Sequence, residues 1–300
     1  MLLDSYKLLF LGVSLCIFSA CQQMENAIDI EFEDGDNELV VECYLEAGQP
    51  YRLLLTETKS YFEVSNICPF VRHAIVVITH NNQKDTLTEA PYTSSGCSSI
   101  QPYFNADSTR IFNYGSTAIC PLDFNNEFQL EVWDTVNNRQ IEATTTFIPP
   151  EPITRFEFEW TWQNDSVASC LLGCQNNPAT NDYYRMTLHK GALSRYNPNS
   201  LFKYTATNPY FDQVLYDQDI FSGNEVFHAS GYHFWRTDTV IGTIYHIDKA
   251  YYDYLVTSRR AEEANLNPFV ESSIILSNIQ GGHGIFTFLS YDRDTVYIPW

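Results

Sequence analysis

The chain has 300 residues, of which 44% are hydrophobic and 15% aromatic, and this composition excludes an intrinsically disordered protein because enough apolar surface is present to offset chain entropy. Its 17 basic and 37 acidic residues give a formal net charge of −20, which repels phosphate backbones and argues against a nucleic-acid partner. Because single cores usually stop growing at about 100–200 residues, we expect two domains.

Residues 1–20 predict a signal peptide. Lys7 is followed by an apolar run over residues 8–18, and small residues then precede Cys21. The run is too short to span a bilayer, which takes about 20 apolar residues. The tetrapeptide Phe18-Ser19-Ala20-Cys21 resembles a bacterial lipobox, and this implies cleavage before Cys21 and acylation of that cysteine. We therefore expect the mature chain to be attached to a membrane by its lipid alone.

The first half of the mature chain predicts strands. After an acidic leader over residues 21–38, short β-branched runs separated by turn residues occur at 39–45, 51–56, 73–79, 127–133 and 140–147. This spacing favours an immunoglobulin-like β-sandwich over residues 39–148. The three prolines of residues 149–152 lack backbone N–H groups, so we expect a stiff linker and a domain boundary there.

Residues 153–300 predict a second antiparallel β domain. Alternation of Phe156, Phe158, Trp160 and Trp162 with polar residues indicates a half-buried strand at 155–162. Further strands are expected at 183–189, 239–246, 274–279, 285–289 and 295–298. One helix is expected over residues 249–264, with Asp248 as its N-cap. The predicted fold class is therefore mainly β: an N-terminal immunoglobulin-like sandwich, then an antiparallel β domain that carries one helix.

The cysteines outside the signal and the anchor are Cys43, Cys68, Cys97, Cys120, Cys170 and Cys174. Export permits disulfides, and only Cys170 and Cys174 lie close in sequence, so we predict a bridge between these two. The pairing of the other four stays open. Because this pair has no second close pair and no nearby His, we predict no metal site.

A recurring triplet of Asp, Ser or Thr, and an aliphatic residue or Thr supplies a second sign of export. The hydroxyl residues of these triplets are Thr86, Ser108, Thr135, Ser166, Thr239 and Thr295. The triplets are similar to O-glycosylation sites of exported Bacteroidota proteins. They also fit an Asp turn that leads into a strand, and both interpretations stay open. An intact mass equal to polypeptide plus lipid would exclude the glycan.

Two loops rich in aromatic residues are candidate binding surfaces. Their residues of interest are Tyr204, Tyr210, Phe211, Tyr232, Phe234, Trp235 and Arg236. Tyr, Trp and Arg supply rigid contact area and directed hydrogen bonds at interfaces. The alternative is that these side chains fill the second hydrophobic core.

The search for catalytic groups predicts no catalytic residue and no cofactor. The closest histidines, His228 and His233, are separated by five positions and fall on opposite faces of an extended strand. No Gly-x-Ser-x-Gly motif occurs, and paired acids such as Glu157 and Glu159 fit a solvated face. We therefore expect a protein that is not an enzyme.

Two segments carry a family resemblance. Asn267-Pro268-Phe269 and Asn278-Ile279-Gln280-Gly281-Gly282, after a tyrosine-rich helix, resemble the closing signature of the Bacteroidota outer-membrane lipoproteins of domain of unknown function 4249. Residues 38–43 are similar to the opening of that family. The resemblance implies a lipoprotein associated with TonB-dependent transporters, and it carries over no catalytic residue. The glycines themselves favour positive φ and close backbone packing, and a strand follows them, so they form no phosphate loop.

These observations lead to three hypotheses of function. The first is a non-catalytic lipoprotein of the outer membrane, exposed at the cell surface, that captures a ligand for a TonB-dependent transporter or caps its channel. The second is a structural accessory subunit of a larger outer-membrane protein assembly, which a broad exposed apolar surface would favour. The third is an envelope hydrolase, which a clustered triad with perturbed pKa values would favour.

Overall fold

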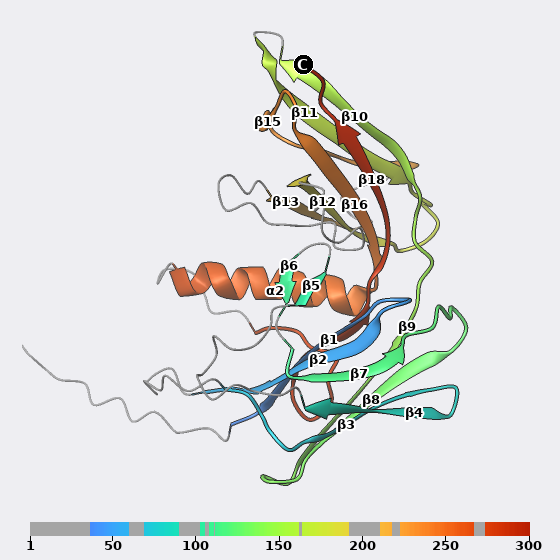
Figure 1. The fold of residues 1–300 in the computed structure, drawn as a ribbon, viewed down its shortest axis with the longest axis vertical. Helices are drawn as coiled ribbons and strands as arrows, with labels where there is room; N and C mark the ends of the chain where they lie inside the picture. Colours follow the sequence, from blue (N-terminus) through green and yellow to red (C-terminus); the bar gives the residue numbers. More distant parts are fainter. Residues whose placement is uncertain are drawn as a thin grey trace, which may run out of the picture. The chain divides into compact units, whose positions relative to one another are not determined.

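The computed structural model describes residues 37–59, 69–89, 103–105, 108–110, 112–161, 164–191, 211–217, 223–266 and 274–300. The described chain is built mainly from β-strands and contains one helix, which confirms the predicted fold class (Figure 1). Asn37–Trp300 form one compact unit.

The first sheet has eight strands. They are β1 (Leu39–Leu45), β2 (Pro50–Glu57), β3 (Ile75–His80), β4 (Gln83–Glu89), β7 (Tyr114–Ile119), β8 (Glu127–Asp134), β9 (Arg139–Thr146) and β17 (His283–Phe288). Their order is β17-β1-β2-β7-β4-β3-β8-β9, and a separate hairpin joins β5 (Tyr103–Asn105) to β6 (Ser108–Arg110). All neighbours in this sheet are antiparallel except β1 and β17, which run parallel.

A single core fills the first sheet because its strands alternate between buried and partly exposed residues. In β1 every second side chain, from Leu39 to Leu45, is buried. These side chains pack in one cluster with Phe128 of β8 and Phe286 of β17. The outermost strands meet next to β17, where Glu142 and Gln280 exchange backbone hydrogen bonds of 3.1 and 2.8 Å. The sheet therefore folds back on itself, which protects its edges from pairing with other chains.

Glycines allow β17 to lie against β1. Gly284 pairs with Val41 and has a φ of +114°, and a Cβ at this position would lie 1.8 Å from the Val41 carbonyl oxygen. Gly281 has a φ of +81° in the turn that precedes the strand. Only glycine accepts these dihedral angles without strain. The predicted role of the glycine run, close backbone packing before a strand, is confirmed.

The rest of the chain forms two four-stranded sheets. One contains β10 (Ile153–Thr161), β11 (Asn164–Gln175), β14 (Glu225–Ala229) and β15 (Phe234–Trp235). The other has the order β13-β12-β16-β18, with β13 (Phe211–Tyr216), β12 (Tyr183–Gly191), β16 (Thr239–Ile247) and β18 (Ser290–Tyr297), all antiparallel. Leu172 of β11 packs with Met186 and Ile244 of the second sheet in one core. The predicted alternation in β10 is confirmed, since Phe156 and Phe158 are partly buried and Glu157 is exposed.

Helix α2 (Lys249–Leu266) agrees with the predicted helix. Asp248 caps it, because its Oδ1 accepts a 2.6 Å hydrogen bond from the backbone N–H of Tyr251. Tyr251 is buried and packs with Tyr245 of β16 and Tyr44 of β1. The helix therefore contacts strands from both halves of the chain.

The predicted linker at 149–152 has no helix or strand, but its neighbours are held in place. His246 Nδ1 donates to the Pro149 carbonyl oxygen at 2.8 Å, and the backbone N–H of Ile153 donates to Asp292 at 2.8 Å. Strand β17 also crosses the predicted boundary, since it belongs to residues 153–300 in sequence and to the first sheet in space. The second half of the chain thus completes the sheet of the first half.

One predicted strand is wrong. Residues 274–279 form no strand, and Ile274 is 84% exposed, Ile275 41% and Leu276 49%. Their apolar composition predicted a strand, but no neighbouring strand offers them a ladder of hydrogen bonds. Single hydrogen bonds hold the segment instead: the Leu276 N–H donates to Thr257 Oγ1 on α2 at 3.0 Å, and Asn278 Nδ2 donates to the Phe286 carbonyl oxygen at 2.7 Å.

Candidate functional site

Buried polar side chains line one face of the β13-β12-β16-β18 sheet. The antiparallel register aligns Arg185, Tyr245 and Tyr291 in one row across β12, β16 and β18, and Thr187, Thr243 and Arg293 in the next row on the same face. His189 lies two residues beyond Thr187 on β12. Neighbouring residues of a strand point to opposite faces, so Met186 and Ile244 enter the core on the other side. We call the polar set the arginine face; its residues are Arg185, Thr187, His189, Thr243, Tyr245, Tyr291 and Arg293.

Most of the arginine face is withdrawn from solvent, whereas Tyr291 and Arg293 are partly buried. Arg185 is 5% exposed and His189 6%, and Thr187, Thr243 and Tyr245 are 0% exposed. Polar and charged groups are costly to bury unless they find partners, so a polar cluster this deep requires specific contacts.

Aromatic rings and hydroxyls orient the two guanidinium groups. Arg185 Nη1 donates to Tyr251 Oη at 3.1 Å, and its Cζ lies 5.0 Å from the centre of the Tyr245 ring. Arg293 Nε donates to Thr243 Oγ1 at 2.8 Å, and its Cζ lies 4.5 Å from the centre of the Tyr291 ring. Both distances suit cation–π contacts. The two positive charges are therefore held in fixed positions on a rigid sheet.

His189 is electrically neutral at neutral pH. Burial first, and then the positive charges of Arg293 and Arg185, lower its pKa from 6.5 to about 4. The permanent charge of the arginine face therefore comes from its two arginines.

Two hydroxyls of the arginine face have no hydrogen-bond partner. These are Thr187 Oγ1 and Tyr245 Oη, both fully buried. An unsatisfied buried polar group costs about 1–3 kcal/mol. A carboxylate contacts this face, because Tyr291 Oη donates to Glu46 Oε1 at 2.6 Å. The face thus combines two guanidinium groups with two buried hydroxyls that have no hydrogen-bond partner.

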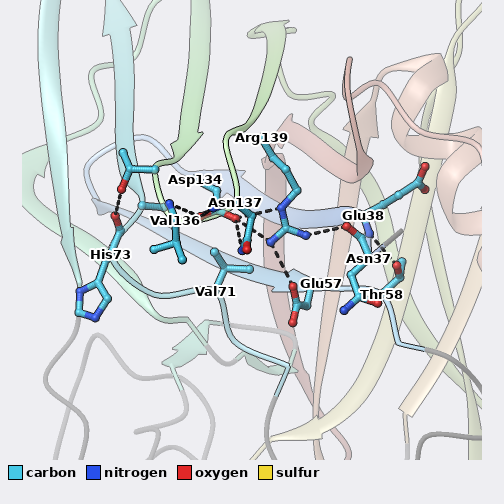
Figure 2. A network of polar contacts seen from close by, with 12 residues as sticks. Asn37, Glu38, Glu57, Thr58, Val71, His73, Asp134, Val136, Asn137 and Arg139 are labelled. Carbon is cyan, nitrogen blue, oxygen red and sulfur yellow. Dashed lines mark hydrogen bonds and ion pairs between the residues drawn. The ribbon is translucent and has the colours of Figure 1, made fainter. Parts of the chain in front are cut away.

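A second polar network lies where β1 begins (Figure 2). Nε and Nη2 of Arg139 donate to Oδ2 of Asp134 at 2.9 and 2.6 Å. Arg139 also donates to Glu57 Oε2 at 3.1 Å and to the carbonyl oxygen of Asn37 at 2.6 Å (Figure 2). The network ties Asn37, near the end of the predicted leader, to strands β2, β8 and β9. Its carboxylates already face several donors, so it acts as a structural clamp.

Comparison with known proteins places the chain in a family. The family described as domain of unknown function (DUF4249) matches residues 25–295. The chain belongs to this family. No curated protein matches the chain. Among solved structures, the crystal structure of the collagen adhesin (CNA) from S. aureus is similar at 9% identity, over 86% of this chain and 94% of that chain, with a TM-score of 0.18.

The residues of the two predicted aromatic binding loops differ in how exposed they are. Tyr232 and Trp235 are 50% and 52% exposed, and Arg236 places its Cζ 5.3 Å from the centre of the Trp160 ring. Phe234 is fully buried in the second core. Tyr204 and Tyr210 lie outside the described residues, and Phe211 begins β13 with its side chain outside the description.

The structure contradicts the predicted disulfide between Cys170 and Cys174. Both are free, buried thiols on β11. Four steps along an extended strand span about 13 Å, which is too far for a bridge. Burial raises the pKa of each thiol to about 12. Cys43 and Cys120 are also free and buried, whereas Cys68 and Cys97 lie outside the described residues.

The other predicted sites differ in exposure. Of the possible glycosylation acceptors, Thr86, Thr135 and Thr295 are exposed, and Ser166 and Thr239 are partly buried. The side chain of Ser108 and the predicted lipid attachment at Cys21 lie outside the described residues. Within the described ranges, no cluster of His, Cys, Asp or Glu could hold a metal ion. In the same ranges, no helix combines the length and apolar character needed to span a bilayer.

Sequence reasoning missed the arginine face. One signal was present, since polar Arg185, Thr187 and His189 alternate with apolar Tyr184, Met186 and Leu188 along the predicted strand. Such alternation ordinarily indicates a solvent-exposed face. Only the pairing with β16 and β18 adds the second arginine and the hydroxyls.

Proposed function

We propose that this protein is a non-catalytic lipoprotein of the outer-membrane surface that captures a ligand for a TonB-dependent transporter. The observation that carries the proposal is the arginine face, a buried cluster of cationic and hydroxyl groups on a rigid sheet. Sites built on strands hold binding groups in place better than sites on loops. The lipobox at Cys21 supports the tether, and the resemblance to lipoproteins associated with these transporters supports the partner.

Ligand capture is preferred to channel capping because of where the polar groups lie. A cap acts through exposed surface, whereas the arginine face is buried beside helix α2, which contributes Tyr251. Small-molecule sites are enclosed and place a few polar groups among apolar and aromatic side chains. Tyr245 and Tyr251 place aromatic rings beside the Arg185 guanidinium.

The chemistry of the arginine face favours binding over catalysis. Guanidinium groups do not release protons in proteins, so Arg185 and Arg293 serve as fixed charges. His189, with its pKa lowered to about 4, is a weak base at neutral pH. Efficient general acid–base catalysts have pKa values near the working pH.

A pull-down from native membranes tests the proposal. Wild-type protein with a C-terminal tag is compared with Cys21→Ala and with Cys16→Ala, a matched control inside the predicted signal. We expect membrane-bound wild type and Cys16→Ala to recover a TonB-dependent transporter, and Cys21→Ala to move to the soluble fraction. Recovery of wild-type protein without a transporter, or firm membrane insertion of Cys21→Ala, refutes the proposal.

The accessory-subunit function is a second candidate, and one observation favours it. Ile274, Ile275 and Leu276 form a run of exposed aliphatic side chains beside α2. Exposed apolar surface of this kind marks protein contact sites. If this function holds, Ile274→Asp reduces recovery of a partner protein while Val136→Asp, at a residue 68% exposed on a turn elsewhere, leaves it unchanged. Equal recovery by both variants excludes contact through this run.

A further inference from the structure

We infer that the solvent-facing side of the sheet formed by β10, β11, β14 and β15 binds an extended, positively charged segment of a partner protein. This sheet is separate from the one that carries the arginine face, and the inference requires neither the lipid anchor nor the transporter. We call the surface the aromatic–acidic face; its residues are Glu157, Glu159, Val167, Leu171, Phe227 and Trp235.

The register of β11 determines which side chains share this face. Every second residue of β11 from Ala168 to Cys174 lies in the core, so the residues between them point to the opposite side of the sheet. Residues directly paired across antiparallel strands point to the same side. This brings onto one face Phe227 beside Gly173, Glu157 beside Leu171, Glu159 beside Ser169 and Trp235 beside Val167.

The face is open to solvent although it carries apolar side chains. Phe227 is 43% exposed and Trp235 52%, and the Glu157 side chain is 55% exposed. Val167 and Leu171 are only partly buried. A sheet face that points to water is ordinarily polar, and exposed aromatic rings are enriched at protein interfaces. The face therefore has the composition of an interaction surface.

The rings and the carboxylates follow one another along β11. The partners of Phe227 and Trp235 on β11 are six residues apart, at Gly173 and Val167, which is about 20 Å along an extended strand. Glu157 and Glu159 lie between these two levels, on the other side of β11. An extended segment of about six residues laid along β11 would therefore meet both rings and both carboxylates.

Charge determines the sign of the partner. The solvent-facing positions of β10 and β14 hold one arginine, Arg155, and three glutamates, Glu157, Glu159 and Glu225. Arg155 Nη2 pairs with Glu157 Oε1 at 2.5 Å, whereas Glu159 has no ion-pair partner among the described residues. Lysine and arginine bind carboxylates and also lie against aromatic rings. The net charge of −20 attracts such a segment from a distance and repels an acidic one.

Fluorescence anisotropy of labelled hexalysine with the purified mature protein in detergent tests the inference. Six lysines match the length of the face, and labelled hexaglutamate is the probe of opposite sign. We expect saturable binding of hexalysine that weakens as sodium chloride rises, and no binding of hexaglutamate. Absence of hexalysine binding overturns the inference. Binding of maltohexaose or of phosphatidylcholine vesicles in its place also overturns it, because the face would then fit a sugar or a lipid surface.

Variants separate this face from the general attraction of a polycation to an acidic chain. Phe227→Ala and Trp235→Ala change no charge, and each should weaken hexalysine binding about threefold by removing a cation–π contact. Glu159→Gln should also weaken it. The matched controls, Phe124→Ala in the loop before β8 and Glu263→Gln on α2, should bind like wild type. Unchanged affinity in both aromatic variants, with native melting curves, refutes the face as the binding site.

Discussion

Arg139 binds Asp134 through two nitrogens, Nε at 2.9 Å and Nη2 at 2.6 Å from the same carboxylate oxygen. The Asp134 side chain is 0% exposed. Burial alone would raise the pKa of Asp134, but hydrogen bonds from Asn137 and Arg139 outweigh it and hold that pKa below its ordinary value. The carboxylate is therefore charged in the folded protein and depends on Arg139 for compensation.

We predict that Arg139→Met lowers the free energy of unfolding by about 3 kcal/mol, because it leaves a buried charge without its cation. Urea unfolding at neutral pH measures this loss. Lys84→Met is the control, since Lys84 is 65% exposed and lies 3.7 Å from Glu131, and such surface pairs contribute about 0–1 kcal/mol. Equal losses in the two variants would contradict the assigned role of the clamp.

The lowered pKa of His189 predicts that the stability of the protein depends on pH. Its pKa is about 4 when folded and 6.5 when unfolded, so between these values the unfolded chain binds a proton that the folded chain does not. The free energy of unfolding should therefore fall by up to about 3 kcal/mol as the pH drops from 6.5 to 4. Urea unfolding at pH 7 and pH 4.5 measures this contribution, which His189→Gln should remove.

The control for this experiment is His73→Asn. The His73 side chain is 76% exposed, and its φ of 60° lies in a region that Asn accepts. This variant should keep the wild-type pH dependence. A curve of the same shape for wild type and His189→Gln would show that His189 does not titrate as assigned.

Gly284 should tolerate no side chain. Alanine there would place its Cβ 1.8 Å from the Val41 carbonyl oxygen at a φ of +114°, so β1 and β17 would have to separate. We expect Gly284→Ala to cost at least about 3 kcal/mol of unfolding free energy, measured by chemical denaturation. Gly223→Ala, whose Cβ would meet its nearest atoms at 3.9 Å, should change stability by less than about 0.5 kcal/mol.

Cys170 and Cys174 should behave as inert thiols. Because they are buried and burial raises the pKa of each to about 12, the native protein should not react with iodoacetamide at these positions at neutral pH. After denaturation without reductant, both should be alkylated, as peptide mass spectrometry can show. A peptide cross-linked between them would contradict the free thiols of β11.

Local patterns predicted much of the fold. Strand β1 has the predicted bounds, and the helix begins at Lys249 beside its predicted cap. Strand β4 escaped prediction because its sequence is polar and only Leu87 is buried, so its neighbours rather than its composition make it a strand. Strand β11 was hidden by Gly173 and by its cysteines, yet it pairs with β10 and β14.

Long-range pairing set the limit of prediction. The candidate site needs Arg185 and Arg293 on one face, and nothing local to either residue predicts that β12 and β18 both flank β16. The prediction of a disulfide was wrong for a related reason. Closeness in sequence suggested a loop at Cys170 and Cys174, whereas an extended strand moves such residues apart.

The parallel pairing of β1 with β17 has a consequence for the order of events during synthesis. The ribosome makes β1 first, but the strand that covers its outer edge is produced almost last. Until then that edge presents unpaired backbone groups, which are a template for aggregation. The first sheet is therefore finished only after the second half of the chain exists, and a product truncated before residue 283 would leave it open.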